Sequence, residues 1–440
     1  MALSVKKGSF TSNTGNGNQA VTGVGFQPKA VIFFATNQTA TGYAAGMSVA
    51  LGWAISSTGR YSISNASDDN VTTSNAGYRQ SDQTCLVPLS NGTPTNGVLG
   101  DFVSMDSDGF TVNWTTNDGT ARIIHYMAIG GSDVSNVATG NFLQPTSTGN
   151  QAITSLGFRP DLVFFAGMGD AVAGNGAGGR LSFGAASGGS NQGLIYLREL
   201  DAQTTMSVSN ALMTDSIYYQ GDPVAGNARR ASFVSLDNSG FTINWSIVDG
   251  TATRNLSYLA IQGGRYWVGA DSQKTSTGTK ANATPGFQPR GVFFMSADAT
   301  TSSSRNDAQE KISIGGTDGT TQGAIWGSAT DNVTTTDTNS ATLTSVALRM
   351  ATNTATTDAE ATISSLDLAG YTLNWTTADA TAREFVAVVM GDATGVYLRP
   401  TSDITVGDWT PTPLYPNIDE TTPSDSDWIQ GTNLIEVKLT

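Results

Sequence analysis

The clearest pattern along the chain is a strict alternation of apolar and polar residues that occurs three times. It reads Gly-Phe-Thr-Val-Asn-Trp at 109–114, Gly-Phe-Thr-Ile-Asn-Trp at 240–245 and Gly-Tyr-Thr-Leu-Asn-Trp at 370–375. A period of two residues is typical of a β-strand with one buried face and one face in contact with water. The pattern therefore predicts three equivalent strands.

A turn signal follows the alternating strand, and a second apolar stretch follows the turn. The turn is Asp118-Gly119 in the first copy and Asp249-Gly250 in the second, and Asp-Gly pairs favour tight hairpins. The stretches after the turns begin at Arg122, Arg254 and Arg383. We therefore expect each alternating strand to form a hairpin with the stretch that follows it.

A second motif, Gly-Phe-x-Pro, leads into an apolar run in each copy. The motif and its run occupy 25–34, 157–165 and 286–294. Proline suits the first residue of a strand because it has no N–H to donate, and an unbroken apolar run is typical of a strand buried on both faces. This motif and the alternating motif recur with nearly the same spacing. The shared spacing indicates three modules of about 130 residues.

The segments between the motifs contain short β-branched pieces, such as 61–64, interrupted by Gly, Asn, Asp and Ser. No long stretch keeps the 3.6-residue period of an amphipathic helix. We therefore predict an all-β fold of three tandem antiparallel β-sandwich modules, of jelly-roll or immunoglobulin-like form. The expected modules are 1–133, 134–265 and 266–393, and the short joints between them favour packing of one module against another.

The pattern changes near the C-terminus, where prolines and acidic residues replace the motifs. Residues 394–440 are too few for a fourth module, so we expect an extended C-terminal arm that docks onto a neighbouring subunit. Its expected apolar anchors are Trp409, Leu414, Tyr415, Ile418 and Trp428.

Composition narrows the possible functions. Charged residues make up 13% of the chain, against about 25% in an average soluble domain, and the net charge is −14. Such an acidic chain lacks the positive surface that phosphate backbones require, so we expect no nucleic-acid partner. The apolar runs are far too short to span a bilayer, so no membrane contact is expected, and the N-terminus has no apolar segment typical of a secretory signal.

Residues suited to catalysis are scarce. The chain has one cysteine, Cys85, which excludes an intramolecular disulfide and a cysteine metal cluster. It has one histidine, His125, in an expected strand, and the equivalent positions carry Ser257 and Val386. We interpret His125 as an ordinary strand residue and Cys85 as a small core residue. Because no pair of carboxylates suited to glycoside hydrolysis stands out either, we expect no enzyme, no cofactor and no metal site.

Two further groups have competing interpretations. The segments 67–70 and 106–109 resemble pieces of calcium-binding loops, but their ligand pattern is incomplete and favours turns. The three repeated arginines stand near Asp118, Asp249 and Asp379. Such an arginine could hold a sugar or a partner's carboxylate, but an exposed ion pair that braces a turn explains the spacing as well, and we favour the ion pair.

The combination of Gly-Phe-x-Pro-x-x-Val-x-Phe-Phe, Gly-Phe-Thr-x-Asn-Trp and a closing Ala-Ile-Gly strand resembles repeats in structural proteins of tailed bacteriophages. The run 398–429 is similar to a segment that recurs in uncharacterised phage proteins. The alternating motif also resembles H-type lectin domains over a short stretch of each module, and no sugar-binding residue is transferred from that likeness.

The resemblance implies a non-enzymatic structural component of a virion, made in the bacterial host cytoplasm. It would be a surface appendage, a fibre-like element or a capsid decoration that contacts other virion proteins and copies of itself. Three fused modules suit a pseudo-threefold position in a symmetric shell, with one chain per threefold site. The alternative is a lectin-like protein that binds bacterial surface glycans, for which Trp53, Trp267 and Trp326 are the tryptophans outside the expected core strands. A depolymerase is the third hypothesis.

Overall fold

The computed structural model describes residues 2–169, 173–221, 228–250, 254–300, 302, 304–306, 308–351 and 356–393. The chain divides into two units, Met1–Asp392 and Ala393–Thr440, and every described strand belongs to the first unit. The expected C-terminal arm and its anchors Trp409, Leu414, Tyr415, Ile418 and Trp428 lie outside the described residues.

Every regular element in the described part of the chain is a strand. The first third contributes β1 (Leu3–Thr11), β2 (Gly17–Thr22), β3 (Pro28–Ala35), β4 (Gly42–Ala45), β5 (Met47–Ala54), β6 (Arg60–Ser67), β7 (Ala76–Ser81), β8 (Leu99–Asp106), β9 (Gly109–Thr116) and β10 (Ile123–Gly131). The second third contributes β11 (Asn136–Leu143), β12 (Gly149–Ile153), β13 (Leu162–Gly167), β14 (Gly174–Ala177), β15 (Gly179–Gly188), β16 (Asn191–Glu199), β17 (Val208–Met213), β18 (Tyr218–Gln220), β19 (Arg229–Asp237), β20 (Gly240–Ile247) and β21 (Asn255–Gln262).

The last third contributes β22 (Arg265–Ser272), β23 (Gly278–Asn282), β24 (Pro289–Ala299), β25 (Ser304–Asn306), β26 (Gln309–Thr317), β27 (Gln322–Thr330), β28 (Thr338–Leu343), β29 (Leu348–Ala351), β30 (Thr357–Asp367), β31 (Gly370–Thr377) and β32 (Glu384–Gly391). We call these thirds the first, second and third module. In the described part of the chain, no helix is long and apolar enough to cross a membrane.

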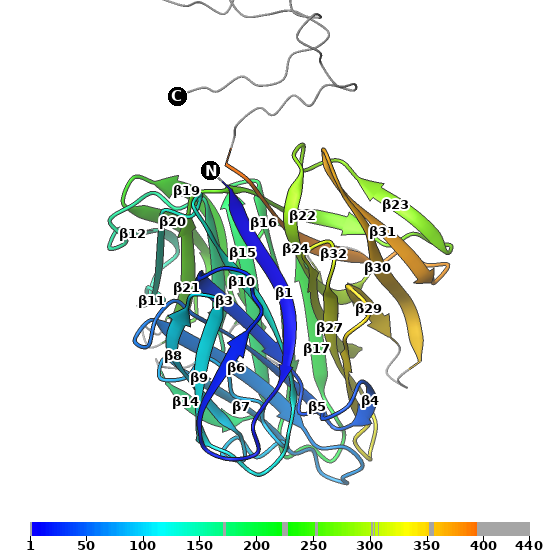
Figure 1. The fold of residues 1–440 in the computed structure, drawn as a ribbon. Helices are drawn as coiled ribbons and strands as arrows, with labels where there is room; N and C mark the ends of the chain where they lie inside the picture. The colour runs from blue at the N-terminus through cyan, green and yellow to red at the C-terminus, as the bar shows by residue number, and fades with distance from the viewer. Residues whose placement is uncertain are drawn as a thin grey trace, which may run out of the picture. The chain divides into compact units, whose positions relative to one another are not determined.

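The described strands form six antiparallel sheets, of which three have seven strands (Figure 1). The seven-stranded sheets have the orders β1-β10-β3-β5-β6-β7-β14, β11-β21-β13-β15-β16-β17-β25 and β22-β32-β24-β26-β27-β28-β4. The smaller sheets have the orders β2-β9-β8, β12-β20-β19-β18 and β23-β31-β30-β29. In each module a hydrophobic core lies between the large and the small sheet, and the all-β sandwich prediction is confirmed.

The other faces of the three large sheets share one central core. In the first module, Phe33 points into the module's own sandwich core, whereas Ile32 and Phe34 on the same strand point into the central core. The ring of Phe293 lies 5.7 Å from that of Phe34 and 6.1 Å from that of Phe164, so all three modules meet there. The apolar run after Gly-Phe-x-Pro is therefore buried on both faces, as its sequence predicts.

The prediction that each alternating strand forms a hairpin with the apolar stretch that follows it is wrong. Strand β9 pairs with β2 and β8, whereas β10 lies in the large sheet between β1 and β3. The physical reason is burial: β9 alternates and needs a wet face, but β10 is buried along almost its whole length and needs an inner layer. The turn at Gly119 therefore carries the chain from one sheet to the other, and β8 and β9 form the hairpin.

Candidate functional site: the seams between modules

Each module gives one short strand to a neighbouring module. Strand β4 of the first module pairs with β28 of the third, β14 of the second with β7 of the first, and β25 of the third with β17 of the second. We call β4, β14 and β25 the exchanged strands. They close a cycle, because every module both gives and receives one strand, so the connectivity has pseudo-threefold symmetry.

Three equivalent loops join the modules a second time, through pairs of backbone hydrogen bonds. Asn70 N–H donates to Thr336 O at 2.8 Å, and Thr336 N–H donates back to Val71 O at 2.9 Å. In the second loop Ala202 N–H donates to Ser74 O, and Ser74 N–H donates back to Gln203 O. In the third loop Asn332 N–H donates to Met206 O, and Met206 N–H donates back to Val333 O. Asn70, Ala202 and Asn332 all have a φ of 56°, so the three loops share one left-handed backbone conformation.

An aspartate in each loop secures the first strand residue of the neighbouring module. Asp69 Oδ1 accepts a hydrogen bond from Thr338 N–H at 2.9 Å, where β28 begins. Asp201 Oδ1 does the same for Ala76 N–H at 2.9 Å, and Asp331 Oδ1 for Val208 N–H at 3.1 Å. Each carboxylate satisfies a backbone donor that would otherwise lack a partner at the strand end.

A sequence signal for these loops exists, but the motifs of the expected strands do not include it. The loops read Asp-Asn-Val-Thr-Thr at 69–73, Asp-Ala-Gln-Thr-Thr at 201–205 and Asp-Asn-Val-Thr-Thr at 331–335, so they recur with the spacing of the modules. We call them the Asp-Thr-Thr loops. Of the two segments that resemble pieces of calcium-binding loops, 106–109 forms the turn between β8 and β9 as expected. The segment 67–70 ends β6 and continues into a bend, where Asp68 accepts from Gly92 N–H at 2.9 Å and from Asn75 Nδ2 at 2.6 Å.

The repeated arginines hold the start of each crossover to an exchanged strand. Their targets are Asn37 Oδ1, Gly169 O and Asp298 Oδ1, contacted by Arg122, Arg254 and Arg383 at 2.5, 2.7 and 2.7 Å respectively. These targets stand at one repeat position, a fixed distance along the chain after the first glycine of Gly-Phe-x-Pro. Each arginine also pairs with the expected aspartate: Asp118, Asp249 or Asp379.

The expectation of an exposed ion pair is wrong for Arg122, which is 1% exposed. Its guanidinium donates to both oxygens of Asp118, and this hydrogen bonding holds the pKa of the Asp118 carboxyl well below its usual range. Arg122 is buried because its guanidinium also donates to Asn37 Oδ1, under the crossover from β3 to β4. The arginine therefore positions the crossover as well as bracing a turn.

His125 and Cys85 are both buried, and Cys85 donates from Sγ to the backbone oxygen of Gly100 at 3.4 Å. His125 lies in β10, its Nδ1 is 3.0 Å from Lys7 Nζ, and its ring stacks on Phe34 at 5.2 Å. Burial lowers the pKa of His125 and lowers that of Lys7 to about 7. Burial raises the pKa of the Cys85 thiol, which keeps it protonated at neutral pH.

The tryptophans considered for sugar stacking are mostly internal. Trp53 and Trp326 are buried, and Trp53 donates from Nε1 to Thr139 Oγ1 of the second module at 2.7 Å. Trp267 is half-buried on β22 and packs against the core of the third module. Neither buried ring is available to a ligand.

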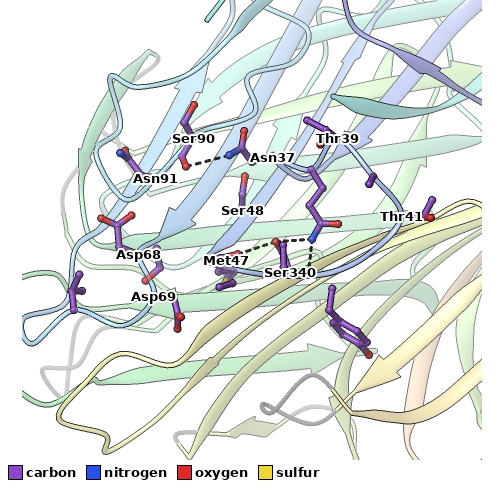
Figure 2. A pocket seen from close by; sticks show the side chains of 18 residues that line it. Asn37, Thr39, Thr41, Met47, Ser48, Asp68, Asp69, Ser90, Asn91 and Ser340 are labelled. Carbon is purple, nitrogen blue, oxygen red and sulfur yellow. Dashed lines mark hydrogen bonds between the residues drawn. The ribbon is translucent and has the colours of Figure 1, made fainter. Parts of the chain in front are cut away.

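A groove of about 610 Å³ opens at the seam between the first and third modules (Figure 2). It lies along the crossover from β3 to β4 and is bordered by the Asp-Thr-Thr loop of the first module and by Ser340 of β28. The recurring Asp-Thr-Thr loop marks one border of this groove, but the crossover residues that form most of its lining carry no motif.

A scan against protein-family models and a search of curated proteins find no match to this chain.

Proposed function

We propose that this chain is a non-enzymatic structural component of a tailed-phage virion. It acts as a preassembled threefold unit that contacts other virion proteins and further copies of itself. The observation that carries the proposal is the cyclic exchange of β4, β14 and β25. Strand exchange around a cycle is the way three subunits interlock, and here one chain supplies all three participants. We call this arrangement the single-chain pseudo-trimer.

The surface composition supports a role in a crowded particle. A net charge of −14 spread over a surface rich in Ser, Thr and Asn keeps neighbouring copies from associating without specificity. The phage-like motifs form the central strands and the alternating strands of this architecture, so the resemblance concerns the residues that build the pseudo-trimer.

The proposal is tested by electron microscopy of intact particles that contain this protein. We expect density for one chain at each position of threefold symmetry, with the three modules distributed around the axis. Three chains at one such axis would contradict the threefold assignment. Absence of the protein from purified particles, checked by mass spectrometry, would overturn the virion role.

A further inference from the structure

We propose that the groove at the seam between the first and third modules binds a neutral oligosaccharide. The groove has the size of a small-molecule site, about 610 Å³. The inference does not depend on the virion role, because it follows from the polar groups that line this groove.

Hydrogen bonds fix the side chains of Asn37 and Gln38 at the groove, and those of Gln38 cross the seam (Figure 2). Gln38 Nε2 donates to Ser340 O at 2.6 Å, and Gln38 Oε1 accepts from Thr342 N–H at 3.0 Å. Asn37 Nδ2 donates to Ser90 O at 3.2 Å. A ligand would therefore meet a surface that is already ordered, which reduces the entropy lost on binding.

The rim carries hydrogen-bonding groups that are not used within the described part of the chain. These are the hydroxyls of Thr39 and Thr41, the Nδ2 amide of Asn91 and the Oδ2 oxygen of Asp69. Thr39 and Thr41 are exposed, whereas Asp69 and Asn91 are half-buried. Two hydroxyls, one amide donor and one carboxylate acceptor match the alternating donors and acceptors of vicinal sugar hydroxyls.

The charge of the groove selects among polar ligands. Asp68 and Asp69 line it, and the described residues of its lining include no lysine or arginine. Phosphate, sulfate and acidic sugars would meet these two carboxylates, and the Arg122 guanidinium, which contacts the lining residues Asn37 and Ser90, is already paired with Asp118. A neutral sugar carries no charge for these carboxylates to repel.

The groove suits a sugar better than a peptide. Its one aromatic residue among those described, Tyr43, already packs edge-on against Trp326 at 5.4 Å and beneath the Arg349 guanidinium at 5.2 Å. Apart from half-buried Val71, the other apolar lining residues are three alanines and buried Met47, which offer little surface to the large anchors that dominate peptide affinity. Because recognition depends on hydrogen bonds without ring stacking, we expect a dissociation constant on the order of 1 mM.

The experiment uses the full chain and saturation-transfer NMR with individual oligosaccharides. The neutral probes are oligomers of glucose, galactose, mannose, rhamnose and N-acetylglucosamine, and the acidic probes are sialylated and galacturonic acid oligomers. Thr41→Arg places a long cationic side chain in the groove at an exposed position. Thr148→Arg is the matched control, because Thr148 is an exposed threonine in the second module.

We expect at least one neutral oligosaccharide to bind the wild type and Thr148→Arg, and Thr41→Arg to weaken that binding at least tenfold. A second variant, Asn91→Asp, keeps the acceptor that Thr93 N–H uses and removes the free amide donor, and we expect a similar loss. Unchanged melting temperatures separate this loss from unfolding. The proposal is overturned if no neutral probe binds, if Thr41→Arg binds as the wild type does, or if acidic oligomers or a random peptide pool bind better.

Discussion

Lys7 is a buried lysine at the seam between the first and third modules. Its side chain is buried, with Nζ 3.0 Å from His125 Nδ1 and 3.1 Å from Gly8 O, and its own backbone N–H donates to Asp318 of the third module at 3.1 Å. Burial lowers the pKa of Lys7 to about 7, from an ordinary value of 10.5. A lysine that must lose its proton in the folded protein links the stability of this seam to pH.

Between pH 7 and pH 10.5 the unfolded chain binds a proton at Lys7 that the folded chain has released. The contribution of Lys7 to stability therefore rises with pH across this window and is lost as pH falls toward 7. We predict that Lys7→Met flattens the rise in unfolding free energy between pH 7 and pH 9, measured by urea denaturation. The control is Lys274→Met, because the Lys274 ammonium makes an exposed hydrogen bond to Thr277 O and is not among the charges that shift the pKa of Lys7. Equal slopes in the wild type and Lys7→Met would refute this linkage.

At the scale of elements, the sequence pattern predicts strands better than it predicts their partners. Alternation located β9, and the apolar run after Gly-Phe-x-Pro located β3. The exchanged strands β4 and β14 escaped prediction, because four residues such as Gly-Asn-Gly-Ala carry no hydrophobic period. Their partners lie in other modules, so pairing is decided by which sheet edge is free in three dimensions. The groove could not be predicted for the same reason, because Ser340 and Gln38 meet only where two modules pack together.

The Asp-Thr-Thr loops allow the seams to be tested at the scale of elements. We predict that Asp201→Ala lowers the unfolding free energy by about 2 kcal/mol, because it leaves the N–H of buried Ala76 without its carboxylate partner. Asp201→Asn keeps an oxygen acceptor and should lose less.

Asp215→Ala is the matched control for this substitution. Asp215 is more than half exposed and pairs with Arg230, and an exposed pair contributes about 0–1 kcal/mol. The unfolding free energies of Asp201→Ala, Asp201→Asn and Asp215→Ala are measured by chemical denaturation and compared with that of the wild type. An Asp201→Ala loss no larger than that of Asp215→Ala would mean that the loop does not hold the seam.

At the scale of the whole molecule, many contacts join distant parts of the chain. Thr36 Oγ1 lies 2.8 Å from Thr342 Oγ1, and Leu3 N–H donates to Asp392 Oδ1 at 2.8 Å, across nearly the full length of the first unit. The repeat spacing indicates three modules, but the spacing alone is equally compatible with three separate domains joined by linkers. Only the exchanged strands and the shared core distinguish the interlocked arrangement. The apolar run after Gly-Phe-x-Pro indicates a strand buried on both faces, but the exchanged strands have no local sequence signal.

The C-terminal segment supplies the prediction at this scale. We expect deletion of residues 395–440 to leave Met1–Asp392 folded, with an unchanged melting temperature, but to abolish incorporation into particles. A full-length variant with serine at the five expected anchors tests whether apolar docking is responsible. Western blotting of purified particles provides the measurement. Normal incorporation of either variant would show that these anchors are not the docking element.

The exchange of strands also bears on how the protein is made. A ribosome that stops after the second module releases a chain in which β4 has no β28 to pair with and β17 has no β25 to cover it. Such a fragment would expose unpaired sheet edges, which are templates for aggregation and targets for proteolysis. Interlocking thus makes completion of the third module a condition for covering the edge of β17 in the second module and for pairing β4 of the first.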